Sequence, residues 1–312
     1  MRALHILGTV FAMATGSPRT DNLPLAIGAM VGLTFFLSLG DALIKGESGG
    51  VSIWQLFALR SALAGLALGA AAFVFLSLTR PTSLRWVALR SALLVANWVA
   101  YYAALPHQPL ALAAASYYTL PIFITLFSAL FLRERVGPLG WLATALGFAG
   151  VLLVLRPGAS GVSVATFLPI LAAILYALSA IVTRAKCRDD HPVTLALALH
   201  AGFVAAGLVG AGVLAWLAPP AADGFMNRAW VPVDASLLGI MAVLAVMILI
   251  GSVGTAVAYQ NAPPSRVGPF DFAYVGFAVL WGWLFFGALP DTLAACGIAL
   301  IVCGGLLAVR AN

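Results

Sequence analysis

Apolar runs separated by short polar gaps occupy the chain from Leu23 to Val309. A helix needs roughly 20 apolar residues to cross the hydrocarbon core of a bilayer, and each run is close to that length. Gly, Pro and charged residues gather in the gaps and indicate turns. The pattern predicts ten membrane-spanning helices: Leu23–Ile44, Ser52–Leu78, Trp86–Leu105, Leu110–Leu132, Gly137–Leu155, Val164–Thr183, Val193–Leu217, Ala235–Asn261, Val267–Leu289 and Thr292–Val309.

The stretch that ends at Arg156 returns near the C-terminus, where it ends at Arg310. With an offset of 154 residues (310 − 156) the two stretches align without a gap. Matched Leu and Ala residues are common in membrane sequences, so the match of Gly150 with Gly304 is more informative. The alignment predicts two copies of a five-span unit, at 23–156 and 163–310, within one integral membrane unit. Because five is odd, the second copy enters the membrane in the opposite direction, and the halves are predicted to be inverted repeats.

Composition supports a membrane protein. Apolar residues make up 63% of the chain and charged residues 8%, whereas a soluble domain carries roughly 25% charged residues. We therefore expect an all-α, polytopic membrane protein surrounded by lipid, with no inserted soluble domain. The net charge of +6 does not indicate nucleic-acid binding, because the charges sit in short gaps and form no basic cluster with aromatic residues.

Lysines and arginines outside the predicted spans are unevenly distributed. With the N-terminus in the cytoplasm, eleven of them lie inside and three (Lys45, Arg156 and Arg228) lie outside. Cytoplasmic loops are enriched in positive charge, so this bias predicts an inner-membrane protein with both termini in the cytoplasm. The eleven are Arg2, Arg19, Arg80, Arg85, Arg133, Arg135, Arg184, Lys186, Arg188, Arg266 and Arg310.

Residues 1–22 precede the first span. Arg2, the apolar run Ala3–Phe11 and Ala12-Met13-Ala14 loosely resemble a signal peptide. The run is short for that purpose, so we expect a poorly ordered extension or a misassigned start.

Polar side chains fall on helical faces of six spans, the first, third and fourth of each half. We expect these faces to line a shared central cavity. The alternative is that the hydroxyl groups bond between packed helices and touch no ligand. The six faces are Thr34, Ser38 and Asp41; Arg90, Asn97 and Tyr101; Tyr117, Thr125 and Ser128; Tyr176, Ser179 and Thr183; Ser252, Thr255 and Tyr259; and Asp271, Tyr274 and Trp281.

Four ionisable residues lie in the spans, where a charge costs at least a few kcal/mol and usually faces a cavity or a partner. Arg90 and Asp271 are at equal depth, which permits an ion pair, and Asp41 could pair with Arg60. Each pair is either a static structural contact or part of a site. In a site, an arginine would bind an anionic or zwitterionic substrate, or an aspartate would carry a coupling proton. If the pair is part of a site, Arg90→Ala should abolish transport and leave expression intact.

Evidence for other chemistry is weak. Gly46-Glu47-Ser48-Gly49-Gly50 matches G-x-S-x-G, but it lies in the turn between the first two spans and not in the α/β sheet that a nucleophile elbow needs. His200 is alone in its span and is expected to pack or to bond to a neighbouring helix. The cysteines lack metal-binding spacing, and a disulfide is not expected. We therefore expect no enzymatic activity, no metal and no cofactor.

The chain resembles the EamA family of the drug/metabolite transporter superfamily over residues 23–310. The resemblance rests on three segments: Leu132-Arg133-Glu134-Arg135, Gly147-x-x-Gly150-Val151-Leu152-Leu153 and Phe286-Gly287-x-x-Pro290-Asp291. It implies ten helices, inverted repeats and transport of small organic metabolites. Many members carry an acidic residue where this chain has Ala288, and Glu134 retains it only in the first half. Residues Trp54–Arg60 and Pro269-Phe270-Asp271 are similar to S-adenosylmethionine or riboflavin carriers.

The sequence therefore predicts a secondary transporter, for uptake or efflux of a small polar or amphipathic metabolite by alternating access. Such a metabolite could be anionic or zwitterionic, like S-adenosylmethionine, riboflavin or an amino acid, and proton coupling is possible. The alternatives are an intramembrane enzyme acting on lipid and a structural membrane scaffold. The expected substrate-binding residues are Arg90, Asn97, Tyr101, Tyr117, Tyr176, Ser252, Thr255, Tyr259, Asp271, Tyr274 and Trp281. The expected coupling or ion-pair residues are Asp41, Arg60, Arg90 and Asp271.

Overall fold

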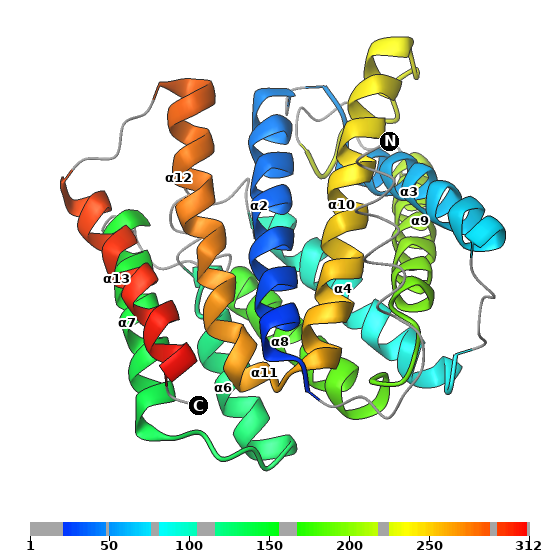
Figure 1. Cartoon of the computed structure of the whole chain (residues 1–312). Helices are drawn as coiled ribbons and strands as arrows, with labels where there is room; N and C mark the ends of the chain where they lie inside the picture. Colours follow the sequence, from blue (N-terminus) through cyan, green and yellow to red (C-terminus); the bar gives the residue numbers. More distant parts are fainter. Residues whose placement is uncertain are drawn as a thin grey trace.

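The computed structural model of the chain is helical, without strands, in the residues that it describes (Figure 1). Described are residues 21–47, 50–75, 81–104, 116–155, 167–217, 225–287 and 292–310. The expectation for the N-terminal extension falls on residues 1–20, which lie outside them. The helices are α2 (Leu23–Glu47), α3 (Ile53–Phe75), α4 (Leu84–Ala104), α6 (Leu120–Phe131), α7 (Pro138–Leu155), α8 (Phe167–Lys186), α9 (Pro192–Leu217), α10 (Ala235–Asn261), α11 (Pro264–Val267), η3 (Gly268–Phe272), α12 (Ala273–Phe286) and α13 (Thr292–Arg310).

Long apolar helices confirm a multi-pass membrane protein. Among the described residues, seven candidate spans are long and apolar enough to cross a membrane: α2, α3, α4, α8, α9, α10 and the run Pro264–Phe285. Large apolar side chains lie on the outside of the bundle, including Phe73 at 87% and Trp216 at 83% exposure. Such a surface is stable against lipid, which solvates apolar side chains.

Helices pack mainly across the two halves of the chain. The most extensive contacts are α7 with α13, α3 with α9, α4 with α8, and α2 with α10, followed by α2 with α12 and α6 with α8. Figure 1 shows α7 beside α13 and α2 between α12 and α10. If each helix is replaced by its counterpart in the other half, this set of pairs maps onto itself: α2–α10 becomes α8–α4, and α2–α12 becomes α8–α6. Every pair in this set joins a helix that precedes residue 156 to one that follows residue 163.

The crossing of α7 and α13 requires glycine. A Cβ atom at Gly150 would lie 2.5 Å from the carbonyl oxygen of Gly297, and one at Gly304 would lie 2.8 Å from that of Ala143. Gly297 and Ala143 are themselves 154 residues apart (297 − 143), so the two glycines meet equivalent atoms. Residues late in α7 face residues early in α13, and the reverse also holds, so the two helices run antiparallel.

Two predicted spans are interrupted near proline. In the predicted helix Leu110–Leu132, Ser116 and Tyr117 are helical, Tyr118 and Thr119 form a turn, and α6 begins at Leu120. The predicted helix Val267–Leu289 is divided into α11, the 3₁₀ helix η3 and α12. Proline has no N–H and its ring clashes with the carbonyl four residues earlier, which accounts for the break at Pro269.

The two breaks meet in the middle of the molecule. Tyr118 and Phe272 are 154 residues apart (272 − 118) and stack on each other, with ring centroids 6.5 Å apart and planes at 27°. Both rings are buried, and Val275 and Ile301 pack beside them. Non-helical backbone at membrane depth is tolerated where protein or a cavity surrounds it, so these breaks mark the centre as the place to look for a site.

Candidate functional site

All seven tyrosines of the chain lie in one region of the bundle interior. Ring contacts join five of them: Tyr101 with Tyr102 at 5.8 Å, Tyr101 with Tyr117 at 5.0 Å, Tyr117 with Tyr118 at 5.9 Å, and Tyr118 with Tyr274 at 5.5 Å. Tyr176 and Tyr259 form a further pair at 6.2 Å. The rings come from α4, the break before α6, α8, α10 and α12. We call these seven residues the tyrosine cluster.

The structure divides the predicted site residues by exposure. Some are only partly buried and keep accessible surface. These are Asp41, Tyr101, Tyr117, Tyr274 and Trp281. The others are buried, and these are Arg60, Arg90, Asn97, Tyr176, Ser252, Thr255, Tyr259 and Asp271.

Two side-chain hydrogen bonds join α2 to α12 at this site. The Tyr274 hydroxyl donates to the Asp41 carboxylate at 2.5 Å, and the Trp281 indole N–H donates to the Ser38 hydroxyl at 3.0 Å. Each half supplies one helix, so the bonds hold the halves together beside the tyrosine cluster.

The expected ion pair between Arg90 and Asp271 is not formed, which corrects that expectation. Arg90 donates from Nε to the Thr183 hydroxyl at 2.8 Å and from Nη1 to the Leu195 carbonyl at 3.3 Å. It therefore faces α8 and α9, whereas Asp271 lies in η3, which packs against α2, α6, α7 and α13. Equal depth along two helices does not bring residues together if they face different neighbours.

The second expected pair, Asp41 with Arg60, is also not a direct ion pair in the described residues, where the Asp41 carboxylate accepts from Tyr274. Arg60 instead lies over two rings, with its guanidinium carbon 5.9 Å from the centroids of both Phe57 and Phe203. Tyr102 lies beside it, and Asp41 is near enough for electrostatic attraction.

Basic residues and interhelical bonds gather at the end of the bundle where α2 begins. Asp21 pairs with Arg184 at 2.8 Å and with Arg188 at 2.6 Å. The Gln260 amide donates to the carbonyl oxygens of Cys187 and Asp190, at 2.5 and 2.6 Å. These bonds tie the start of α2 to the ends of α8 and α10.

At the opposite end of the bundle, the segment of residues 225–234 crosses the starts of α3 and α10. Gln55, which is buried, accepts from the Val231 amide at 2.9 Å and donates to the Val231 carbonyl at 2.7 Å. The Trp54 indole donates to the Met226 carbonyl at 3.0 Å. Phe225 packs on Tyr102 with centroids 5.4 Å apart, so this segment covers the tyrosine cluster from that side.

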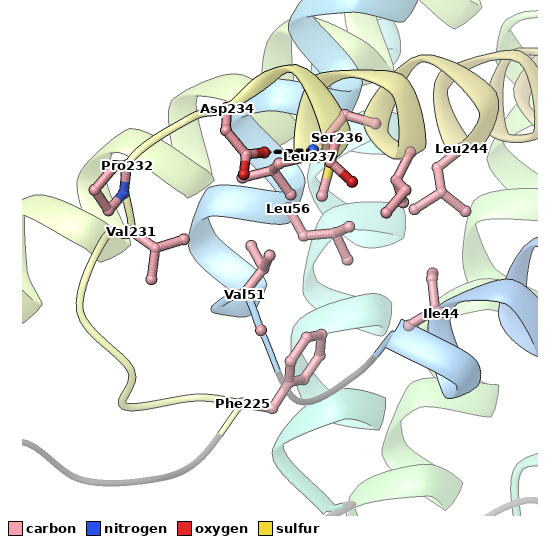
Figure 2. Close-up of a pocket in the computed structure, with 13 residues that line it drawn as sticks. Ile44, Val51, Leu56, Phe225, Val231, Pro232, Asp234, Ser236, Leu237 and Leu244 are labelled. Atoms are coloured by element: carbon pink, nitrogen blue, oxygen red, sulfur yellow. Dashed lines mark hydrogen bonds between the residues drawn. The ribbon is translucent and has the colours of Figure 1, made fainter.

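Next to this segment is an apolar pocket of about 260 Å³ (Figure 2). It is lined by Ile44, Val51, Leu56, Phe225, Val231 and Leu244, among others. Asp234 lies at its rim, where its carboxylate caps α10 by accepting from the Leu237 amide at 2.7 Å. The sequence did not predict this pocket. The only signal for it in the sequence was Gln55, a single polar residue in the apolar run after Ser52.

Little here suggests metal or thiol chemistry. No group of three His, Cys, Asp or Glu residues that could hold a metal occurs in the described part of the chain. Cys187, Cys296 and Cys303 are free. His200 shares a hydrogen bond of 3.1 Å with Ser252 between α9 and α10, as the packing interpretation of this residue predicts. Glu134 accepts from the Ser265 hydroxyl at 2.6 Å, and Ala288 lies outside the described residues.

Comparison with known proteins shows the family to which the chain belongs. Residues 24–156 and 163–310 each match the EamA-like transporter family. The chain is 35% identical over 221 residues to a riboflavin transporter of Rhizobium johnstonii, covering 70% of this chain and 67% of that one. It is 29% identical to the pseudopaline exporter CntI of Pseudomonas aeruginosa, over 65% of this chain and 67% of the other. A solved crystal structure with 22% identity and a TM-score of 0.72 shares the fold over 92% of this chain and 96% of its own. The chain therefore belongs to the EamA-like transporter family, in the drug/metabolite transporter superfamily.

Proposed function

We propose that the chain is a secondary transporter that carries a small polar or amphipathic metabolite through the tyrosine cluster by alternating access. The observation that carries this proposal is the group of accessible side chains, with one carboxylate and several aromatic rings, between the two halves. Tyrosines and tryptophans can stack on a planar ring and hydrogen-bond to its polar edge. Asp41, Tyr101, Tyr117, Tyr274 and Trp281 would touch the substrate. The buried residues predicted for the site would form its walls.

The two halves, 23–156 and 163–310, would be inverted repeats. The exchange of helix pairs between halves and the antiparallel crossing of α7 and α13 support this arrangement. An axis in the membrane plane gives two equivalent packings, one open to each side, which is the basis of alternating access. The bonds of Asp21 and Gln260 would close one end, and the segment held by Gln55 would close the other.

Orientation follows from charge. Arg85, Arg133, Arg135, Arg184, Lys186, Arg188 and Arg266 lie at or near the helix ends on the side where α2 begins. Positive residues are enriched on the cytoplasmic side, which supports an inner-membrane protein with both termini in the cytoplasm.

Riboflavin is the first candidate substrate. Three relatives are named riboflavin transporters, from Rhizobium johnstonii, Brucella anthropi and Vibrio cholerae, at 35%, 29% and 34% identity. The flavin ring is planar and has carbonyl and N–H groups on its edge, which suits a lining of tyrosines. S-adenosylmethionine is the second candidate, because a Rickettsia bellii relative with 20% identity is named for its uptake.

Uptake by the purified protein tests this function. Labelled riboflavin or S-adenosylmethionine is added to the buffer outside the proteoliposomes, with and without a proton gradient. We expect saturable uptake of at least one compound above that of protein-free liposomes, reduced at least tenfold by Trp281→Ala. Stimulation by the gradient would indicate proton coupling. Absence of transport of both compounds in either direction would refute the substrate proposal, and release of a lipid product would favour the enzyme alternative.

A further inference from the structure

Arg60 is a buried cation in the middle of α3, at 5% exposure. Phe57 and Phe203 lie against its guanidinium, each with its centroid 5.9 Å away. The Tyr102 hydroxyl is within hydrogen-bonding reach of it, and Asp41 and His200 are near enough to interact with it electrostatically from α2 and α9. A guanidinium removed from water needs hydrogen-bond acceptors, so the role of Arg60 depends on which groups accept its hydrogen bonds.

One edge of this guanidinium has no partner. Nε and Nη2 are both buried, and neither finds an acceptor among the residues that the structure describes. These two nitrogens present parallel N–H groups, the fork that binds the two oxygens of a carboxylate or phosphate. Arg90 differs, because its Nε is bonded to Thr183 and its Nη1 to Leu195, which leaves only Nη2 without an acceptor.

The neighbouring titratable groups do not occupy the fork. The Asp41 carboxylate accepts from Tyr274, His200 Nε2 is bonded to Ser252, and His200 Nδ1 is itself buried without a partner. An unsatisfied buried donor costs about 1–3 kcal/mol, and more when it is charged. Two such donors on one edge, next to the accessible Asp41, are arranged to receive a molecule that brings its own oxygens.

We propose that the Nε–Nη2 edge of Arg60 binds an oxyanion of the transported molecule, a carboxylate or a phosphate, while Phe57, Phe203 and Tyr102 pack against the adjoining part of that molecule. This inference rests on the proposed function and adds a substrate class to it: metabolites that carry an acidic group close to an apolar or aromatic one. Of the two candidate substrates, S-adenosylmethionine carries a carboxylate and riboflavin carries no acidic group, so the inference favours the former. It also assigns the anion-binding role to Arg60 in place of Arg90.

Small probes test the fork without knowledge of the substrate. Benzoate and benzamide have the same shape and differ in charge, and phenyl phosphate supplies the other oxyanion. The purified full-length protein in detergent is heated with each probe. We expect benzoate or phenyl phosphate, but not benzamide, to raise the melting temperature of the wild type. The oxyanion that raises the melting temperature more shows whether the site prefers a carboxylate or a phosphate.

Variants assign the effect to Arg60. Arg60→Gln should weaken oxyanion binding by about tenfold or more, as expected for loss of charge-assisted hydrogen bonds. Arg60→Lys keeps the charge without the fork and should also lose most of the binding, which provides a second variant if Arg60→Gln fails to fold. Arg135→Gln removes an exposed charge at the end of the bundle and should bind as the wild type does. Equal effects of benzoate and benzamide, or oxyanion binding retained in both Arg60 variants, would overturn the proposal.

A transport assay distinguishes failure of this inference from failure of the proposed function. If the wild type takes up S-adenosylmethionine, benzoate should inhibit that uptake, and Arg60→Gln or Arg60→Lys should lower it by about tenfold or more. Uptake of S-adenosylmethionine that is equal in all three proteins and unaffected by benzoate, or uptake of riboflavin alone, would keep the function and reject the oxyanion site. If the wild type transports nothing in the panel, the proposed substrates are wrong, and the melting experiment still decides whether Arg60 binds an oxyanion.

Discussion

Gly150 and Gly304 meet equivalent atoms of each other's helices, 2.5 Å and 2.8 Å from the nearest carbonyl oxygens when a Cβ is placed on each. The two residues are 154 positions apart (304 − 150), and so are the Gly297 and Ala143 oxygens that they approach. A contact that repeats itself under exchange of the halves is expected if a two-fold axis relates them, as proposed. The glycine match found in the sequence is thus a packing requirement of the α7–α13 crossing.

Alanine at either glycine should destabilise the protein by a similar amount. The added methyl group would push α7 from α13, and overpacking of this kind costs about 1–3 kcal/mol. Melting temperatures of Gly150→Ala and Gly304→Ala in detergent should both fall. Gly28→Ala and Gly212→Ala are matched controls, because nothing lies within 4 Å of the added atom. A fall in only one of the two variants would contradict the equivalence of the halves.

Apolar runs predicted the helices well because the length of a span is set by the bilayer. The predicted helix Ala235–Asn261 is α10, and Thr292–Val309 is one residue shorter than α13. The breaks before α6 and in η3 were not predicted. Pro121 and Pro269 lie at the starts of α6 and η3, but hydropathy alone does not distinguish a kinked helix from a divided one.

Contacts between helices were less predictable than the helices. Helical periodicity placed Asp41 and Tyr274 on polar faces but gave no sign that they bond to each other, 233 residues apart. Depth suggested that Arg90 meets Asp271, yet Arg90 bonds to Thr183. The direction in which a residue faces depends on how the helices are arranged around the centre, and a single sequence gives no measure of that arrangement.

Loss of the bond between Asp41 and Tyr274 should impair transport more than stability. A single buried hydrogen bond contributes about 0.5–1.5 kcal/mol, so Tyr274→Phe should fold. We expect at least a several-fold lower transport rate, because the bond links α2 to α12 beside the accessible residues. If Asp41 carries the coupling proton, Asp41→Asn should abolish stimulation by a proton gradient and Tyr274→Phe should retain it. Equal stimulation in both variants would exclude Asp41 from coupling.

Arg90 should matter for packing of α4 against α8 and α9. Arg90→Ala removes two charge-assisted hydrogen bonds, each worth about 1.5–3 kcal/mol, and should lower the melting temperature as well as abolish transport. Thr183→Val removes only the acceptor of Nε and tests the packing role alone. If Arg90 acts only through packing, transport in the two variants should fall in proportion to stability. Arg90→Ala with normal stability and no transport would instead place Arg90 in the binding site.

Cysteine labelling should determine the orientation. Cys187, Cys296 and Cys303 are first replaced by Ala; burial raises the pKa of the Cys187 thiol to about 11, so it would contribute little labelling in any case. Arg135 lies at the basic end of the bundle, and Asn227 lies at the opposite end, between Met226 and Val231 in the segment that Trp54 and Gln55 hold. In intact cells, a membrane-impermeant maleimide should label Asn227→Cys and leave Arg135→Cys unmodified until the cells are opened. The reverse pattern would invert the proposed topology, and labelling of both from one side would show that the two ends do not lie on opposite faces of the membrane.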